Sequence, residues 1–180
     1  ASAEWSDLFL ADGGQILFGN DQDVTLTHVA DSGLALKSIA TADNKPIRLV
    51  LQTGETDMAA NDVIGALDFQ APDEGTGTDA VLVAASIEAV SEGDFSSSAN
   101  ATSLVFKTGA SEAAAAKLSL TSAGHLLPAT DDTHDLGSAS FQWRNIYTGD
   151  LHLSNESKSE GNKVDGTTGN WTIQEGSEDL

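Results

Sequence analysis

The sequence predicts an all-β fold, and three observations support that prediction. Apolar residues recur at every second position in short segments, for example at Leu34 and Leu36 and again at Leu49 and Leu51; this is the spacing of a strand with one buried face. Gly, Asn and Asp separate the segments at intervals of roughly ten residues, a rhythm typical of all-β proteins. The three prolines lie outside the centres of the predicted strands. This agrees with the prediction, because proline has no N–H to donate to a neighbouring strand.

The predicted strands follow one another along the whole chain. Each is a run of alternating apolar residues that ends at a turn residue. They cover residues 15–19, 24–30, 34–40, 47–54, 64–70, 80–90, 103–109 and 117–124, with a further strand around Trp143 and another around Trp171.

One segment favours helix over strand. Residues 111–118 read SEAAAAKL, with Ser111 as a possible cap and alanine as the best helix former. Eight residues are marginal as an isolated helix. We therefore expect a single helical turn or a loop here, and little helix overall.

Two segments also share a pattern. LTHVADSGLAL (26–36) and LTSAGHLL (120–127) each contain a strand, a turn with glycine and a returning strand. The similarity predicts two β-hairpins of the same kind. It does not indicate a solenoid with a repeat of fixed length.

Composition excludes several classes of protein. The 180 residues carry 28 Asp and Glu against 8 Lys and Arg, a formal charge of −20, which repels nucleic acids and anionic membranes. No apolar run is long enough for membrane insertion. The lack of cysteine excludes disulfides and thiolate metal sites. Aromatic residues are only 6% of the chain, so one chain has little with which to build a core, and oligomerisation is one solution.

Three acidic clusters are candidate calcium sites, because calcium prefers six to eight oxygen ligands. None matches a known calcium loop, and Asp is also a common turn former because its side chain bonds nearby backbone. Solvated turns are thus the alternative interpretation. The candidate ligands are Asp21 and Asp23, or Asp73 and Asp79, or Asp131 and Asp132.

Nothing in the sequence points to a catalytic site. The motifs of nucleophilic serine hydrolases, phosphate loops and dinucleotide-binding folds are absent, and the four histidines lack metal-ligand spacing. Paired carboxylates could hydrolyse a glycosidic bond, but the regions between the tryptophans are poor in the aromatic residues that line such clefts. We therefore expect no enzymatic activity and no cofactor other than calcium.

The bulkiest side chains gather in residues 141–147. Phe141, Trp143, Ile146 and Tyr147 surround Arg144, one of only two arginines. A tight turn over residues 131–138, ending in a glycine, is expected to lead into this segment. If the segment is a strand, its alternate residues lie on opposite faces.

The same region carries a resemblance to a known family. Leu127-Pro128, Asp131, Asp135-Leu136-Gly137-Ser138 and Trp143-Arg144-Asn145-Ile146-Tyr147 resemble a passage that recurs in bacteriophage tail fibres, tail spikes and related virion proteins. Residues 63–120 and 161–180 are similar in composition and rhythm to the shafts and C-terminal modules of marine phage fibres. The resemblance covers most of the chain.

The resemblance implies a fold and an assembly. It implies an elongated, fibrous homotrimer of short strands and hairpins, built as a β-helix or as a shaft of stacked sheets. Residues 1–127 would be a β-rich shaft, and residues 128–180 a distal or junction module, with a longer parent protein left open. Small residues such as Ala84, Ala85 and Ala89 let another backbone approach closely, so we expect them to lie near the threefold axis of such a trimer.

The resemblance also implies a subunit interface. Trp143 would be buried against neighbouring subunits, and Arg144 would pair with Asp135 or Asp132 across a boundary, because its planar guanidinium suits a carboxylate. Leu136, Ile146 and Tyr147 complete this expected interface. A sugar-binding aromatic platform at Trp143 or Tyr147 is the alternative.

The implied function is structural and adhesive. Such a chain would belong to the tail of an extracellular virion, contact other tail proteins and attach to a glycan or protein receptor on the host surface. Two alternatives stay open: a spike that degrades polysaccharide, and a non-viral extracellular adhesin or surface-layer module.

Overall fold

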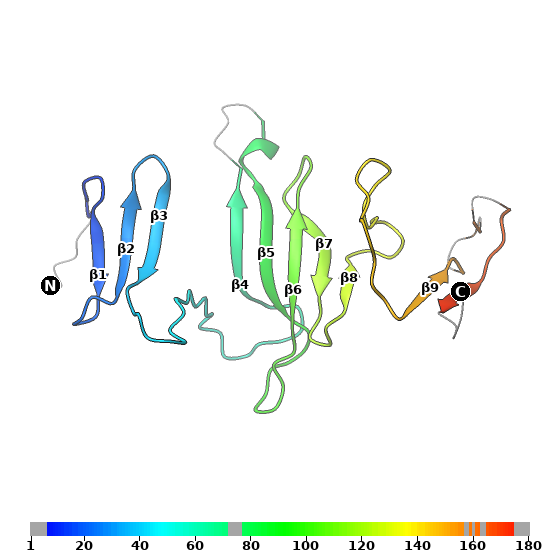
Figure 1. Cartoon of the computed structure of the whole chain (residues 1–180), viewed down its shortest axis with the longest axis horizontal. Helices are drawn as coiled ribbons and strands as arrows, with labels where there is room; N and C mark the ends of the chain where they lie inside the picture. The colour runs from blue at the N-terminus through cyan, green and yellow to red at the C-terminus, as the bar shows by residue number, and fades with distance from the viewer. Residues whose placement is uncertain (1–6, 72–76, 157–158, 160, 163–164, 175–180) are drawn as a thin grey trace. The chain divides into compact units, whose positions relative to one another are not determined.

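A computed structural model describes residues 7–71, 77–156, 159, 161–162 and 165–174 (Figure 1). Its ten strands form three antiparallel sheets. Within the described residues there is no α-helix, and the one helical element is a 3-10 turn, η1, at Asp79–Val81. The predicted all-β fold is confirmed. The chain divides into two compact units, residues 1–129 and 130–180.

The first sheet has three strands in the order β1 (Gln15–Phe18), β2 (Val24–Val29) and β3 (Gly33–Ser38). Each pairs with the next through a short turn, and Leu26 lies between Ile16 and Leu36 in the register. These strands match the first three that the alternating pattern predicts. The β2–β3 pair is the first of the two hairpins predicted from the shared sequence pattern.

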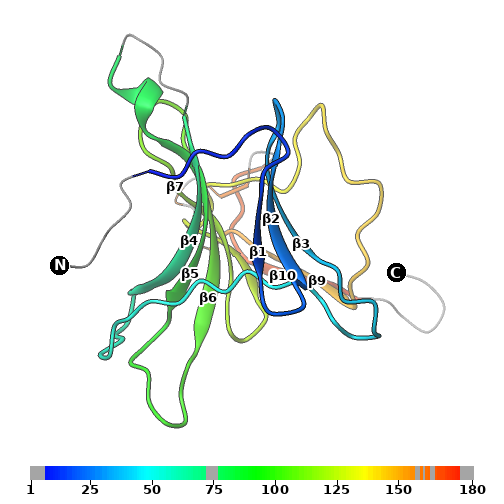
Figure 2. The same cartoon turned by 90° about the vertical axis from the view of Figure 1, so that its left-hand side faces the viewer.

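The second sheet has five strands in sequence order: β4 (Val63–Gln70), β5 (Val83–Ser91), β6 (Thr102–Thr108), β7 (Ala115–Leu120) and β8 (Leu126–Pro128). Figure 2 shows β4, β5 and β6 following one another in a twisted layer. The second predicted hairpin is β7–β8. It turns at Gly124, whose φ of +83° lies in the region that favours glycine.

The second compact unit contains a two-stranded sheet, β9 (Asp150–Ser154) paired with β10 (Asn170–Gln174). Trp171 stands opposite Leu153 in this register. A two-stranded sheet is marginally stable by itself in water, so this hairpin depends on further contacts.

Two predicted strands are wrong. Residues 47–54 alternate as a strand does but form none, because no neighbouring strand in the described structure supplies a ladder partner. The segment around Trp143 is also irregular. Its backbone bonds locally: Ser138 N–H donates to the Phe141 carbonyl at 2.8 Å, and Phe141 N–H donates to Ser138 Oγ at 3.0 Å. The predicted alternation of faces in 141–147 is therefore wrong too.

The alanine-rich segment 111–118 is corrected as well. Residues from Ala115 onward are strand β7, paired with β6 over five positions. The ladder and the packing of Leu118 outweigh the helix propensity of alanine, which amounts to less than about 1 kcal/mol per residue. The strand predicted at 80–90 begins at Val83, after η1.

The strand connections also correct one expected architecture. A β-helix stacks coils in parallel, whereas every strand pair in the described residues is antiparallel and most are joined as hairpins. Neither a β-helix nor a closed sheet is present in that part of the chain. Stacking of sheets in a homotrimer stays a prediction.

Burial within the described chain is unusual. No apolar residue there is buried, and the buried polar residues are Thr25, Ser86 and Ser91. A folded domain normally buries most of its large apolar side chains. Each sheet therefore leaves an apolar surface without cover.

Candidate functional site

The five-stranded sheet places most of its large apolar side chains on one face, whereas Val90, Val105 and Leu127 lie on the other. Paired residues of an antiparallel sheet point to the same side, so the register defines rows that cross the sheet. Both central rows are entirely apolar. One is Leu67, Ile87, Phe106, Leu118 and Pro128; the other is Gly65, Ala89, Leu104, Leu120 and Leu126. We call this surface the apolar face.

The apolar face is the more exposed side of the sheet. In β6, Leu104 and Phe106 are exposed, whereas Ser103, Val105 and Lys107 on the opposite side are half-buried. At the two edges, Phe69 of β4 is 57% exposed and Leu126 of β8 is 60% exposed. A single chain thus leaves uncovered the side of the sheet that would gain most from being buried.

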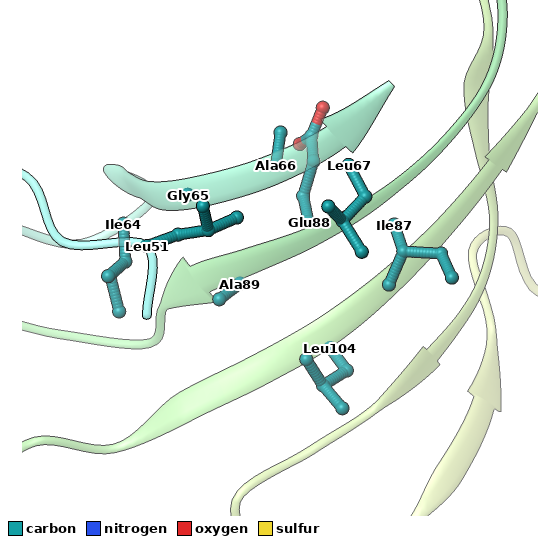
Figure 3. Close-up of a pocket in the computed structure, with 9 residues that line it drawn as sticks. All are labelled: Leu51, Ile64, Gly65, Ala66, Leu67, Ile87, Glu88, Ala89 and Leu104. Carbon is teal, nitrogen blue, oxygen red and sulfur yellow. The ribbon is translucent and has the colours of Figure 1, made fainter. Parts of the chain in front are cut away.

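The opposite face carries polar contacts, and we call it the polar face. Ser86 Oγ donates to Asp68 Oδ1 at 2.6 Å, and Lys107 Nζ lies 2.6 Å from Glu88 Oε2. Figure 3 shows the Glu88 carboxylate on one side of the sheet and the side chains of Ile87 and Leu104 on the other. The two faces therefore differ in chemistry as well as in exposure.

A shallow apolar pocket lies at one corner of the apolar face (Figure 3). Leu51 reaches this corner from the irregular segment 47–54, and its Cβ lies 3.1 Å from the position of a Cβ added to Gly65. The lack of a side chain at Gly65 thus admits Leu51. Leu51 remains 46% exposed, so it covers only the rim.

The two smaller sheets show the same division. In the first sheet, Ile16, Leu26 and Leu36 form one row, and the neighbouring row contains Leu17, Thr25 and Lys37. In the β9–β10 hairpin, Leu153 pairs with Trp171 and Leu151 with Ile173 on one side, and the Ser154–Asn170 pair lies on the other. All four of these apolar residues are exposed. Each sheet is amphipathic and uncovered on its apolar side.

The interface residues predicted around Trp143 all lie on the surface of the second unit. Trp143 is 64% exposed and Tyr147 is 92% exposed, and Leu136 and Ile146 are exposed as well. Trp143 Cδ1 would lie 3.4 Å from a Cβ at Gly137, which has a φ of +91°, so the indole packs on the glycine turn.

The predicted partners of Arg144, Asp132 and Asp135, are exposed, as is Arg144 itself. Within the described residues no carboxylate lies within 4 Å of the Arg144 guanidinium. Burial of Trp143 against another subunit and pairing of Arg144 with Asp135 or Asp132 across a boundary therefore stay predictions.

Of the predicted calcium ligands, the structure brings Asp21 and Asp23 together. Their Oδ1 atoms lie 3.1 Å and 3.0 Å from the position of a Cβ at Gly19, whose φ is +83°. Asp73 lies outside the described residues. Asp79, Asp131 and Asp132 are exposed turn residues. In the described part of the chain, no three His, Asp or Glu side chains converge as a metal site requires.

Sequence reasoning missed one polar cluster, at the end of β5. Glu92 accepts hydrogen bonds from Ser103 Oγ at 2.5 Å, from Ser122 N–H at 2.7 Å and from Ser122 Oγ. These bonds hold the pKa of Glu92 below its ordinary value of 4.5, and the bond from Ser103 lowers it most. The carboxylate joins the start of β6 to the β7–β8 turn. No sequence pattern links residues 30 positions apart, so no local signal could reveal this contact.

The second unit has a similar carboxylate network. Asp165 Oδ1 accepts from Thr167 N–H at 3.0 Å and from Thr167 Oγ1 at 2.8 Å, and Asn162 Nδ2 donates to it at 2.6 Å. These bonds lower the pKa of Asp165, the backbone bond of Thr167 most of all. Asn155 also accepts from Gly169 N–H at 2.9 Å, which fixes the loop just before β10.

No helix in the described ranges has the length and apolar character needed to cross a bilayer. Comparison with known proteins found no family model, no curated protein and no solved structure that matches this chain.

Proposed function

We propose that this chain is a structural component of a bacteriophage tail fibre or tail spike, and that it works as a homotrimer. The observation that carries the proposal is the arrangement of its apolar side chains. All three sheets place most of them on one face, and within the described residues none is buried. A chain built in this way needs neighbouring copies to remove those faces from water, and symmetric assembly supplies them.

The proposal places the chain in the tail of an extracellular virion, in contact with other tail proteins. The resemblance of Asp135-Leu136-Gly137-Ser138 and Trp143-Arg144-Asn145-Ile146-Tyr147 to tail fibre passages supports this role. The charge of −20 supports a surface that stays soluble and repels nucleic acid. We propose a non-enzymatic role, attachment to a glycan or protein receptor on the host.

Attachment is tested with the fluorescently labelled full chain on a panel of bacterial cells. Saturable binding to particular strains supports the proposal. Release of reducing sugar from the capsular polysaccharide of those strains would instead favour the spike that degrades polysaccharide. Binding to abiotic surfaces and to the cells of its own producer, with none to other strains, would favour a non-viral adhesin.

A further inference from the structure

We infer that the apolar face of the five-stranded sheet is the surface through which copies of this chain bind one another, with the polar face turned to solvent. The inference rests on the proposed homotrimer and adds the surface that holds it together. The two central rows contain no charged or hydroxyl side chain across five strands. A surface of this kind is normally removed from water.

The apolar face is large enough to form a substantial part of a subunit interface. Five strands about 4.8 Å apart, and the two apolar rows about 7 Å apart, give a footprint of roughly 340 Å² before the relief of the side chains is counted. A standard interface buries about 800 Å² per partner, so residues that flank the two rows must also contribute to the contact. Apolar surface patches of roughly 300–600 Å² are often functional.

Charge favours the same face. Two chains that each carry −20 repel each other, so copies can meet only where few carboxylates are brought together. The apolar rows satisfy that condition. Contact through the polar face would bring Glu88 and Asp68 of each copy toward those of the next and would cover the Lys107–Glu88 ion pair.

The partner is another copy because the contact has to be permanent. Since no apolar residue of the described chain is buried, the sheet has no interior of its own to stabilise it. Its cover must therefore be present whenever the chain is folded, as in an obligate oligomer. A second copy of the same chain is always present where the chain is made.

Neighbouring residues of β6 provide a matched test. Phe106→Lys places a charge on the apolar face, and Val105→Lys places the same charge one residue away on the polar face, opposite Glu88. We expect Phe106→Lys to abolish the oligomer in sedimentation velocity and to remove β-structure in circular dichroism. Val105→Lys should keep both. A trimer that persists in the Phe106→Lys variant would overturn the inference and leave the proposed function standing, whereas a folded monomer of the unmodified chain would overturn both.

A second measurement does not depend on disrupting the fold. The chain has no cysteine, so Ala89→Cys on the apolar face and Ala66→Cys on the polar face each introduce one nitroxide label per chain. Because each chain carries one label, any dipolar coupling that is measured is between labels on two different copies. Packed sheets lie about 10 Å apart, so we expect the distance between labels at position 89 to be shorter than that at position 66 by at least ~10 Å. Equal distances, or a shorter distance at position 66, would contradict the inference.

Discussion

Glu88 and Lys107 form an ion pair between adjacent strands of the five-stranded sheet, with Oε2 and Nζ 2.6 Å apart. They are diagonal neighbours, since Glu88 pairs with Val105 and Lys107 with Ser86. Their side chains are 13% and 27% exposed. The ion pair is thus better shielded from water than Leu104 or Phe106 on the other face, the reverse of the usual pattern in a soluble domain.

Loss of this ion pair should weaken the fold without changing the assembly. We expect the double-mutant cycle of Glu88→Ala and Lys107→Ala to give a coupling free energy of about 0.5–1 kcal/mol, because the pair is partly exposed. Urea unfolding of the four proteins measures it, and the sedimentation mass should stay unchanged. A change of oligomeric state in either single variant would place the polar face in the subunit contact instead.

Glu92 should make stability depend on pH. Its pKa is lowered in the folded chain, so the stabilisation is present above about pH 4.5 and is lost as the pH falls through the folded pKa. We expect Glu92→Gln to lower the urea midpoint at pH 7 and to reduce the fall in that midpoint between pH 5 and pH 3. Asp94→Asn, which removes the charge of an acid two residues away, serves as control. Identical pH profiles for the Glu92→Gln variant and the unmodified chain would refute this role of Glu92.

Trp143→Ala separates the two interpretations of the exposed aromatic segment. If Trp143 is buried between subunits in the assembly, its loss costs on the order of 3–5 kcal/mol per site, and trimer stability falls. Arg144→Ala should then cost roughly 0–1 kcal/mol if the arginine stays exposed, and more if its removal leaves a buried carboxylate unpaired. Unchanged trimer mass and melting with lost binding to cells would identify a receptor site instead.

Salt should stabilise the protein. Bringing several chains of charge −20 together is opposed by their repulsion, so added NaCl is expected to raise the melting temperature. If Asp21 and Asp23 bind calcium, CaCl₂ should raise it further than NaCl of equal ionic strength. The excess should vanish in the Asp21→Asn, Asp23→Asn double variant. Equal shifts with the two salts would leave screening as the whole effect.

The sequence predicts most of the strands because alternation is a local signal. Residues 24–30 and 103–109 match β2 and β6 to within a residue or two at each end. Residues 47–54 carry the same signal, and only the absence of a ladder partner keeps them irregular. Local pattern reveals the tendency to form a strand, whereas pairing depends on residues elsewhere in the chain.

The candidate interface could be predicted only in part. A shortage of aromatic side chains predicted that one chain could not enclose a core, and the structure shows no buried apolar residue among those it describes. The apolar face itself depends on register, which sets Leu67, Ile87 and Phe106 in one row from three separate strands. A slip of one residue would turn a strand's apolar side chains to the other face, and sequence alone does not fix that register.

The mass of the full chain in solution tests the central proposal most directly. Sedimentation equilibrium over a range of concentrations, at moderate salt, should return about three times 18.6 kDa, roughly 56 kDa, together with the β-rich circular dichroism of a folded chain. A single species of 18.6 kDa with the same β content at every concentration would contradict it.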